Sequence, residues 1–243
     1  RNGTLANNHG GAVKMLSSSS SFTNCVFTRN YSQVNSGGAI YADASSSPSF
    51  SNNEFRFNHS VQFGGAIFTQ SNLHLSGGLF LGNYANLGGG VSTQGSVSCS
   101  FSNIRILGNE ANSSGSSSGG FAYFNTGCIG STFVNCEISG NRSLGRNGVY
   151  RPTGATRFVN CSIVGNQSAA EGGIVLLFTG DSLALDNSII WGNTASNGNE
   201  IYVNSGTASA NYSLFNPAQS IGTISGSNNL NSDPLFTDAD GTD

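Results

Sequence analysis

The sequence predicts an all-β fold, a right-handed parallel β-helix of about eight rungs with three parallel sheets. The composition is the first observation. Glycine is abundant at 34 residues, and only 9% of the residues are charged, against about 25% in an ordinary globular domain. Glycine, asparagine and serine all disfavour helices. The second observation is a repeat of 24 to 31 residues. A unit this short must stack on copies of itself to bury a core.

Each repeat unit opens with a pair of turn residues. A glycine pair suits a tight corner, because glycine adopts positive φ at little cost. The pairs are Gly10-Gly11, Gly37-Gly38, Gly64-Gly65, Gly88-Gly89, Gly119-Gly120 and Gly172-Gly173, with Asn147-Gly148 and Asn199-Glu200 in the same place in two other units.

A second element combines an aromatic or aliphatic residue with an asparagine two residues later. Strand alternation points the aromatic residue inward, which predicts an interior column of Phe22, Phe50, Phe101, Phe133 and Phe158. The asparagine falls where the alternation breaks, and this favours a left-handed bend. Rungs about 4.8 Å apart would stack these residues into an internal hydrogen-bonded ladder of Asn24, Asn52, Asn103, Asn135, Asn160 and Asn187.

Each unit closes with another asparagine, which we expect at an open corner. These residues are Asn30, Asn58, Asn83, Asn109, Asn141, Asn166 and Asn193. On this interpretation Asn135→Ala destabilises the fold more than Asn141→Ala. Four of the closing asparagines also begin N-x-S sequons, and we expect these four to be accessible to glycosylation: Asn30, Asn58, Asn141 and Asn166.

The repeat covers residues 1–210, and residues 211–243 lack it. We expect this C-terminal segment to close or cover the helix. Because Arg1 is an unusual natural start, we also expect the chain to be a piece of a longer protein. The net charge of −3 and the lack of a basic run argue against nucleic acid. No apolar stretch reaches the ~18–20 residues of a transmembrane helix.

The repeat motifs resemble those of one known family. Gly-Gly-Ala-Ile at 37–40 and 64–67 resembles the GGAI motif of chlamydial polymorphic outer-membrane proteins. Phe27-Thr-Arg-Asn30, Phe55-Arg-Phe-Asn58 and Phe80-Leu-Gly-Asn83 match their second motif, FxxN. Copies after residue 100 drift towards I-x-G-N and are similar to bacterial parallel β-helix repeat proteins. The resemblance implies an extracellular or outer-cell-surface location and a role in surface display and adhesion.

Three classes of function can be compared with the residues of this sequence. The first is a non-catalytic adhesin or structural stalk, which we favour. The alternative is a polysaccharide-binding or polysaccharide-degrading enzyme, which needs clustered carboxylates. The outward column of the third strand, however, reads Val26, Glu54, Leu79, Arg105, Glu137, Ser162 and Ile189, without adjacent carboxylates. His9, His59 and His74 fall in different columns. The third class is a self-assembling or ice-binding scaffold, which no threonine column supports.

The sequence offers little metal chemistry. Asp238, Asp240 and Asp243 resemble part of a calcium loop, although an acidic turn is the simpler interpretation. No other cofactor is expected, and the absence of C-x-x-C argues against zinc.

The cysteines favour buried free thiols. Cys25, Cys136 and Cys161 share one inward column, and Cys99 also faces inward. A Cys136–Cys161 or a Cys99–Cys128 bridge stays open at this point.

An apolar stripe on one outer face predicts a contact surface. Its residues are Leu79, Leu81, Leu107, Val164 and Trp191, on strand faces where polar residues are the rule. We expect the C-terminal stretch to cover Trp191. A host surface, a glycan or a sister subunit would meet Leu81 and Leu107.

Overall fold

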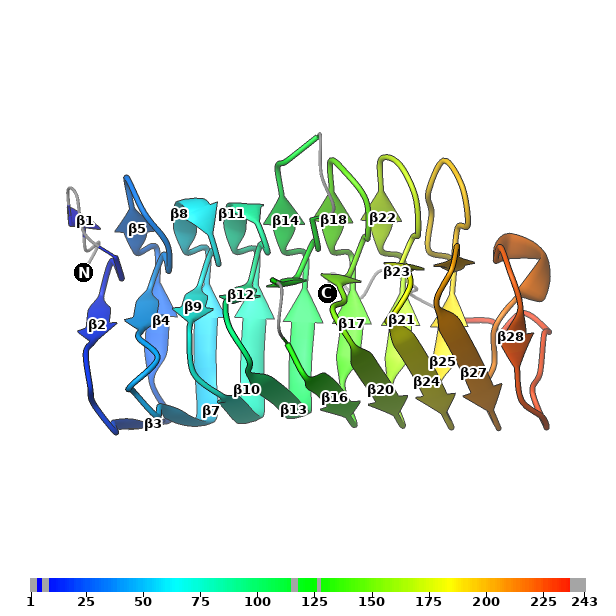
Figure 1. Ribbon diagram of the computed structural model, residues 1–243, viewed down its shortest axis with the longest axis horizontal. Coiled ribbons are helices and arrows are strands. Elements are labelled where there is room, and N and C mark those ends of the chain that lie inside the picture. The colour runs from blue at the N-terminus through cyan, green and yellow to red at the C-terminus, as the bar shows by residue number, and fades with distance from the viewer. Residues whose placement is uncertain (1–3, 6–8, 115–117, 126–127, 237–243) are drawn as a thin grey trace.

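The computed structural model describes residues 4–5, 9–114, 118–125 and 128–236, and in this part of the chain the fold is a parallel β-solenoid. Its turns stack along one long axis from the N-terminal to the C-terminal end (Figure 1). Every strand pairing is parallel and joins a strand to its counterpart one repeat away, as Phe50 with Phe22 in β7 and β3. The predicted three-sheet architecture is confirmed.

The first sheet has seven short strands, and all of them except β1 begin directly after a closing asparagine. They are β1 (Thr4–Leu5), β5 (Tyr31–Ser32), β8 (His59–Phe63), β11 (Tyr84–Leu87), β14 (Glu110–Ala111), β18 (Arg142–Ser143) and β22 (Gln167–Ser168).

The second sheet follows the glycine pairs. It consists of β2 (Val13–Met15), β6 (Ile40–Ala42), β9 (Ile67–Thr69), β12 (Val91–Thr93), β15 (Ala122–Phe124) and β19 (Tyr150–Arg151), and the pair β23 (Val175–Leu177) and β26 (Ile201–Val203) comes next along the chain.

The third sheet is bent at the asparagines of the second element. Its strands before or through the bend are β3 (Ser21–Thr23), β7 (Ser49–Arg56), β10 (Leu73–Leu81), β13 (Ser98–Leu107), β16 (Gly130–Val134), β20 (Ala155–Val159), β24 (Ser182–Asp186), β27 (Thr207–Asn211) and β28 (Ile224–Ser225). After the bend come β4 (Val26–Thr28), β17 (Glu137–Ser139), β21 (Ser162–Val164) and β25 (Ile189–Trp191).

The interior is filled by residues in register from turn to turn. Phe101, Phe133 and Phe158 stack with ring centroids 4.6 Å apart at each step, and all three are fully buried. Phe22 and Phe50 stack at 5.4 Å in the same column, so the predicted phenylalanine column is confirmed. A second column begins with Phe27, Phe55 and Phe80 and continues with Ile106, Ile138, Ile163 and Ile190.

The second glycine of each pair is required by the close approach of neighbouring turns. A Cβ placed on Gly38 would collide with the carbonyl oxygen of Gly65, and one placed on Gly120 would collide with that of Gly148. At the C-terminal end the pair is Gly198-Asn199, because Gly198 has a φ of +61° and Gly173 meets the Asn199 carbonyl. The predicted pair Asn199-Glu200 is therefore wrong by one residue.

The asparagines of the second element make the predicted bend but lie on the outside. Asn24, Asn52, Asn103, Asn135, Asn160 and Asn187 all have φ between +49° and +56°, and all six are exposed. Side-chain amides link Asn103, Asn135, Asn160 and Asn187 at 2.7 to 3.2 Å. This outer ladder faces solvent, so the expectation that it is internal is wrong.

The buried ladder is formed by the closing asparagines, and the expectation that Asn141 lies at an open corner is wrong. Asn141 is 0% exposed. Its Nδ2 donates to the Asn166 Oδ1 at 2.9 Å and to the Ile106 carbonyl at 3.0 Å. Its Oδ1 accepts from the backbone N–H and the Nδ2 of Asn109. The same pattern links Asn30, Asn58, Asn83, Asn109, Asn141, Asn166 and Asn193.

The residue before each ladder asparagine is left-handed, which explains the drift of the closing motif. Arg29 and Phe57 have φ near +53° in the first copies. In the later copies glycine takes this position, as Gly82, Gly108, Gly140, Gly165 and Gly192. Because glycine adopts positive φ without the Cβ penalty, FxxN and I-x-G-N describe one backbone geometry.

Residues 212–230 continue the stack at the C-terminal end. Leu214 bridges in parallel to Ile189 and to Leu230, and β28 pairs with β27. Tyr212, with a φ of +50°, takes the bend position that asparagine holds in earlier turns. A 3-10 turn, η1 (Pro217–Gln219), lies between Leu214 and β28 along the chain.

We predict that Asn141→Ala destabilises the fold more than Asn135→Ala, the reverse of the order expected from the sequence. The first change leaves the backbone N–H and one amide proton of Asn109 and the Ile106 carbonyl without their partner, at ~1–3 kcal/mol each. The second change exposes groups that water can solvate and costs about 1 kcal/mol, mainly because alanine resists positive φ.

Both substitutions delete the same atoms, so each is the control for the other. Urea unfolding should place the midpoint for Asn141→Ala well below that for Asn135→Ala. Equal midpoints would mean that the buried ladder contributes no more than the outer one.

Candidate functional site

The outward face of β10, β13, β16, β20 and β24 carries a groove of about 530 Å³. Each residue that immediately precedes an inward Phe or Leu points outward here, so successive turns place His74, Ser100, Thr132, Arg157 and Ala184 side by side. Ser98 and Ser182 also line the groove. The exposed side chain of Ile129, 69% accessible, stands at its edge.

Side-chain contacts fix the polar groups of this groove. The His74 Nδ1 and the Ser100 Oγ are 2.7 Å apart. Arg157 donates from Nε to the Asp186 carboxylate at 2.8 Å, so the guanidinium charge is balanced on the next turn. The groove therefore offers the Ser100 and Thr132 hydroxyl groups on neighbouring turns, which are about 4.8 Å apart, with a neutralised charge at one side.

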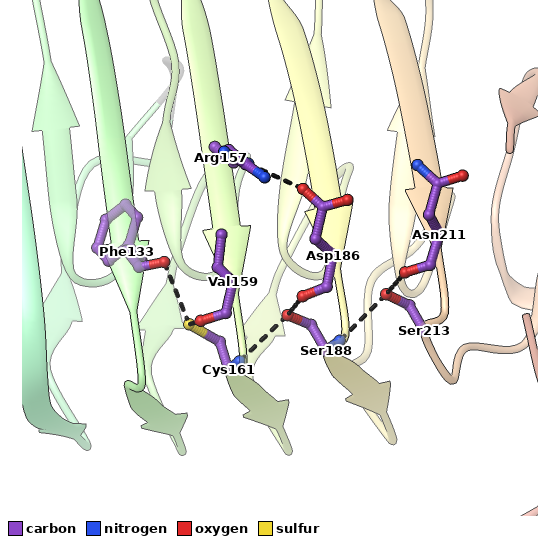
Figure 2. Close-up of polar contacts among 8 residues, drawn as sticks. All are labelled: Phe133, Arg157, Val159, Cys161, Asp186, Ser188, Asn211 and Ser213. Carbon is purple, nitrogen blue, oxygen red and sulfur yellow. Dashed lines mark hydrogen bonds and ion pairs between the residues drawn. The ribbon is translucent and has the colours of Figure 1, made fainter.

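The bend beneath the groove is held by a hydrogen-bonded chain of small polar side chains (Figure 2). The Cys161 N–H donates to the Ser188 Oγ at 3.1 Å, and the Ser188 N–H donates to the Ser213 Oγ at 3.1 Å. Each hydroxyl donates back to a carbonyl two residues earlier, Asp186 and Asn211. These bonds fix the backbone that carries Asp186 and, through it, Arg157.

A second cavity of about 410 Å³ lies at the corner beside the groove. Arg151, Thr153 and Phe178 line it. The Arg151 guanidinium lies 5.3 Å from the centroid of the Tyr123 ring and donates to the Phe124 carbonyl.

Asp181 also lines this cavity but acts as a turn brace. It accepts from the backbone N–H groups of Gly154 and Phe178. Asp186 pairs instead with the Arg157 guanidinium. Asp181 and Asp186 therefore bind different groups and do not act as one pair of carboxylates.

The cysteines are free thiols, and Cys99, Cys128, Cys136 and Cys161 are buried. Cys161 donates to the carbonyls of Phe133 and Val159 at 3.5 and 3.3 Å (Figure 2). A hydrogen bond from the Cys99 thiol lowers the pKa of Cys128 to about 6. Cys128 also lines the corner cavity.

The outward column of the third strand is confirmed in register, from Val26 and Glu54 to Ser162 and Ile189. Its oppositely charged members pair across adjacent turns, with 2.7 Å between Arg105 and Glu137. Glu54 pairs with Arg56 on its own strand.

The three described histidines are apart, as expected. His9 lies against the Tyr41 ring, and His59 lies between Tyr31 and Tyr84. Burial lowers the pKa of both imidazoles. His74 is in the groove. Within the described ranges, no three His, Cys, Asp or Glu residues gather as metal ligands. Asp238, Asp240 and Asp243, the residues that resemble part of a calcium loop, lie outside those ranges.

The apolar stripe forms a column in register, from Leu81 and Leu107 through Ser139 to Val164 and Trp191. Leu79 lies beside it on β10. Leu81, Leu107 and Trp191 are half-buried, Val164 is buried, and Ser139 interrupts the stripe. Whether a partner covers Leu79, Leu81 and Leu107 stays a prediction.

Glu200 ends the buried asparagine ladder. Its Oε2 accepts from the Asn193 Nδ2 at 2.6 Å, in the place that the next asparagine would fill. The residue is 2% exposed, and burial raises the pKa of its carboxyl to about 7. Trp191, Thr194 and Gln219 line a cavity of about 290 Å³ beside it.

No helix in the described part of the chain has the length and apolar character needed to cross a membrane. Comparison with protein-family models, curated proteins and solved structures found no match. The resemblance to chlamydial surface proteins is therefore carried by the GGAI and FxxN motifs alone, and it stays a prediction.

We predict that Glu200→Gln removes a pH dependence of stability. Because the pKa of Glu200 in the folded chain is raised to about 7, from an unfolded value near 4.3, its contribution is present below pH ~4 and is lost as the pH rises to about 7. The loss is of the order of 3 kcal/mol. Glutamine keeps a hydrogen-bond acceptor and carries no charge.

Thermal unfolding across pH 4 to 8 measures this effect. The Glu200→Gln chain should keep its melting temperature where the unchanged chain loses stability. Glu110→Gln, at an exposed ion pair with Arg142, is the matched control and should leave the slope unchanged. An identical slope in the Glu200 variant would refute the prediction.

Proposed function

We propose that this chain is a non-catalytic β-helix of a secreted or cell-surface protein, a rigid rod that presents a glycan-binding face to its surroundings. The single observation that carries the proposal is the groove across β10, β13, β16, β20 and β24. Its outward column places the hydroxyl groups of Ser100 and Thr132 on neighbouring turns, between His74 and Arg157, so a polar polymer can meet hydrogen-bonding groups on successive turns.

The contrast between interior and exterior supports a display role. Inside, the same residue types recur in register, as in the column of Phe101, Phe133 and Phe158. Outside, the groove column changes from one turn to the next, as His74, Ser100 and Thr132 show. A repeated interior holds a rod of fixed geometry, and exterior residues that vary can create a local binding face.

The acids argue for structure more than for catalysis. Glu54, Glu137 and Asp186 each sit in an ion pair with an arginine at 2.7 or 2.8 Å. An acid–base pair that cleaves a polysaccharide needs two carboxyl groups facing one glycosidic bond. Binding without cleavage agrees better with carboxylates that are already paired.

We predict that Thr132→Tyr abolishes glycan binding by filling the groove. Thr132 is half-exposed at the centre of the groove, and its neighbours on the flanking strands are Ser100 and Arg157. When the purified chain is screened on an array of neutral and acidic glycans, it should bind at least one class of glycan. The variant should bind that class at least roughly tenfold more weakly, about 1.4 kcal/mol.

Ser162→Tyr is the matched control, because Ser162 is also half-exposed and outward, but on β21 beyond the bend. Both variants should melt like the unchanged chain. Equal binding by the two variants would remove the groove from the proposal. Release of reducing ends from the bound polysaccharide would instead favour the alternative, a polysaccharide-degrading enzyme.

A further inference from the structure

Four asparagines of the buried ladder are also the first residues of N-glycosylation sequons. These are Asn30-Tyr-Ser32, Asn58-His-Ser60, Asn141-Arg-Ser143 and Asn166-Gln-Ser168. The N-x-S/T motif is the acceptor sequence for N-linked glycans. The coincidence has a structural origin.

The serine of each motif has its own structural role, separate from that of the asparagine. Two residues after the ladder asparagine, the chain reaches the inward position of the first sheet, where a small side chain is required. Ser60, Ser143 and Ser168 donate there to nearby loop carbonyls at 2.7 to 2.9 Å. Alanine holds this position in two turns, as Ala85 and Ala111, in register with the serines. The sequons therefore arise from a ladder residue and a packing residue.

The acceptor nitrogen of each ladder asparagine is out of reach in the folded chain. Asn58, Asn141 and Asn166 are 0% exposed, and Asn30 is 4% exposed. The Asn166 Nδ2 donates to the Asn193 Oδ1 at 2.9 Å and to the Ile138 carbonyl at 3.0 Å. A glycan would replace one of these protons and would need space that the interior lacks.

Among the sequons in the described residues, Asn112-Ser113-Ser114 alone has both its asparagine and its final serine exposed. It follows β14 directly, where the chain leaves the first sheet. The two other described sequons are less open. Asn160 binds Asn135 and Asn187 in the outer ladder, and Ser213, the hydroxyl residue of the Asn211 sequon, is 2% exposed.

We propose that Asn112 is the N-glycan acceptor of the folded chain, and that Asn30, Asn58, Asn141 and Asn166 are cryptic acceptors whose modification prevents the solenoid from closing. In this transfer the amide nitrogen attacks the anomeric carbon of a lipid-diphosphate-linked oligosaccharide. The N–C bond forms, the C–O bond to the diphosphate breaks, and the nitrogen gives up one proton. The glycan donor and its transferase belong to the host compartment.

A kinetic consequence follows for any compartment that glycosylates chains before they fold. Glycosylation and ladder formation compete for the same side-chain nitrogens. A chain that folds first carries sugar at Asn112 and keeps its ladder. A chain modified first at Asn141 keeps one N–H in place of the two that bond Ile106, Ser139 and Asn166. The attached sugar also has no space in the interior, so the stack is not completed.

The direct test uses full-length chain made in a bacterial host without N-glycosylation. The chain is treated with a purified oligosaccharyltransferase and a lipid-linked oligosaccharide, either folded or held unfolded in the highest urea the enzyme tolerates. Peptide mass spectrometry reads the occupancy of each site. Asn112 should be modified in both states. Occupancy at Asn141 and Asn166 should be at least roughly tenfold lower in the folded state, because access requires local opening.

A secretion experiment tests the folding consequence. The chain is secreted from glycosylating eukaryotic cells beside a variant with Ser32→Ala, Ser60→Ala, Ser143→Ala and Ser168→Ala. This variant lacks the four cryptic sequons and keeps every ladder asparagine, and Ala85 and Ala111 show that the position accepts alanine. Thermal unfolding of the variant from bacteria verifies its fold first.

The secreted yield of the variant should exceed that of the unchanged chain several-fold, and tunicamycin should abolish the difference. Folded, secreted chain that carries glycans at Asn141 or Asn166 would overturn the proposal that these sites are cryptic. Equal yields from the two chains would overturn it as well. A folded chain left unmodified at Asn112 would overturn the accessible site.

Discussion

The buried asparagine ladder is the interaction on which the rest of this solenoid depends. Each amide, such as that of Asn109, uses its oxygen to accept two hydrogen bonds from the turn before and its nitrogen to donate to the turn after. A buried amide that is fully paired stabilises the fold, whereas an unpaired one is costly. The ladder therefore holds each turn at one height and one rotation relative to its neighbours.

The ladder also explains the local sequence around it. The residue before each asparagine must be left-handed to turn the side chain inward, and the later copies meet this demand with glycine, as at Gly108 and Gly140. The second glycine of the opening pair, such as Gly120, lets the backbone approach the Gly148 carbonyl of the next turn and the backbone of Arg142, directly after the ladder residue. Between these fixed corners the inward columns need only fill space, so phenylalanine gives way to isoleucine from Phe80 to Ile106 without loss of register.

Because the buried residues fix how the turns stack, the outward residues can differ from one turn to the next. The groove at Ser100, Thr132 and Arg157 exists only where those turns stack, and the apolar stripe at Leu81 and Leu107 belongs to another face. At the C-terminal end the repeat loses its asparagine, and Glu200 supplies a carboxyl in its place. A group that should be neutral there becomes ionisable, which makes this end of the ladder sensitive to pH.

The solenoid class, the three sheets, the phenylalanine column and the left-handed bends at residues such as Asn135 could all be predicted from the sequence. Each of these follows from periodicity, because a repeated unit can only stack in register with itself. Which of the two asparagine ladders is buried could be seen only in the folded chain. Both sets repeat at the same period and carry the same amide. Asn135 is itself the left-handed residue and faces water, whereas Asn141 follows the left-handed Gly140 and turns inward. The groove and the hidden sequons could likewise be seen only there, since both depend on which side of the backbone a residue faces once the turns are stacked.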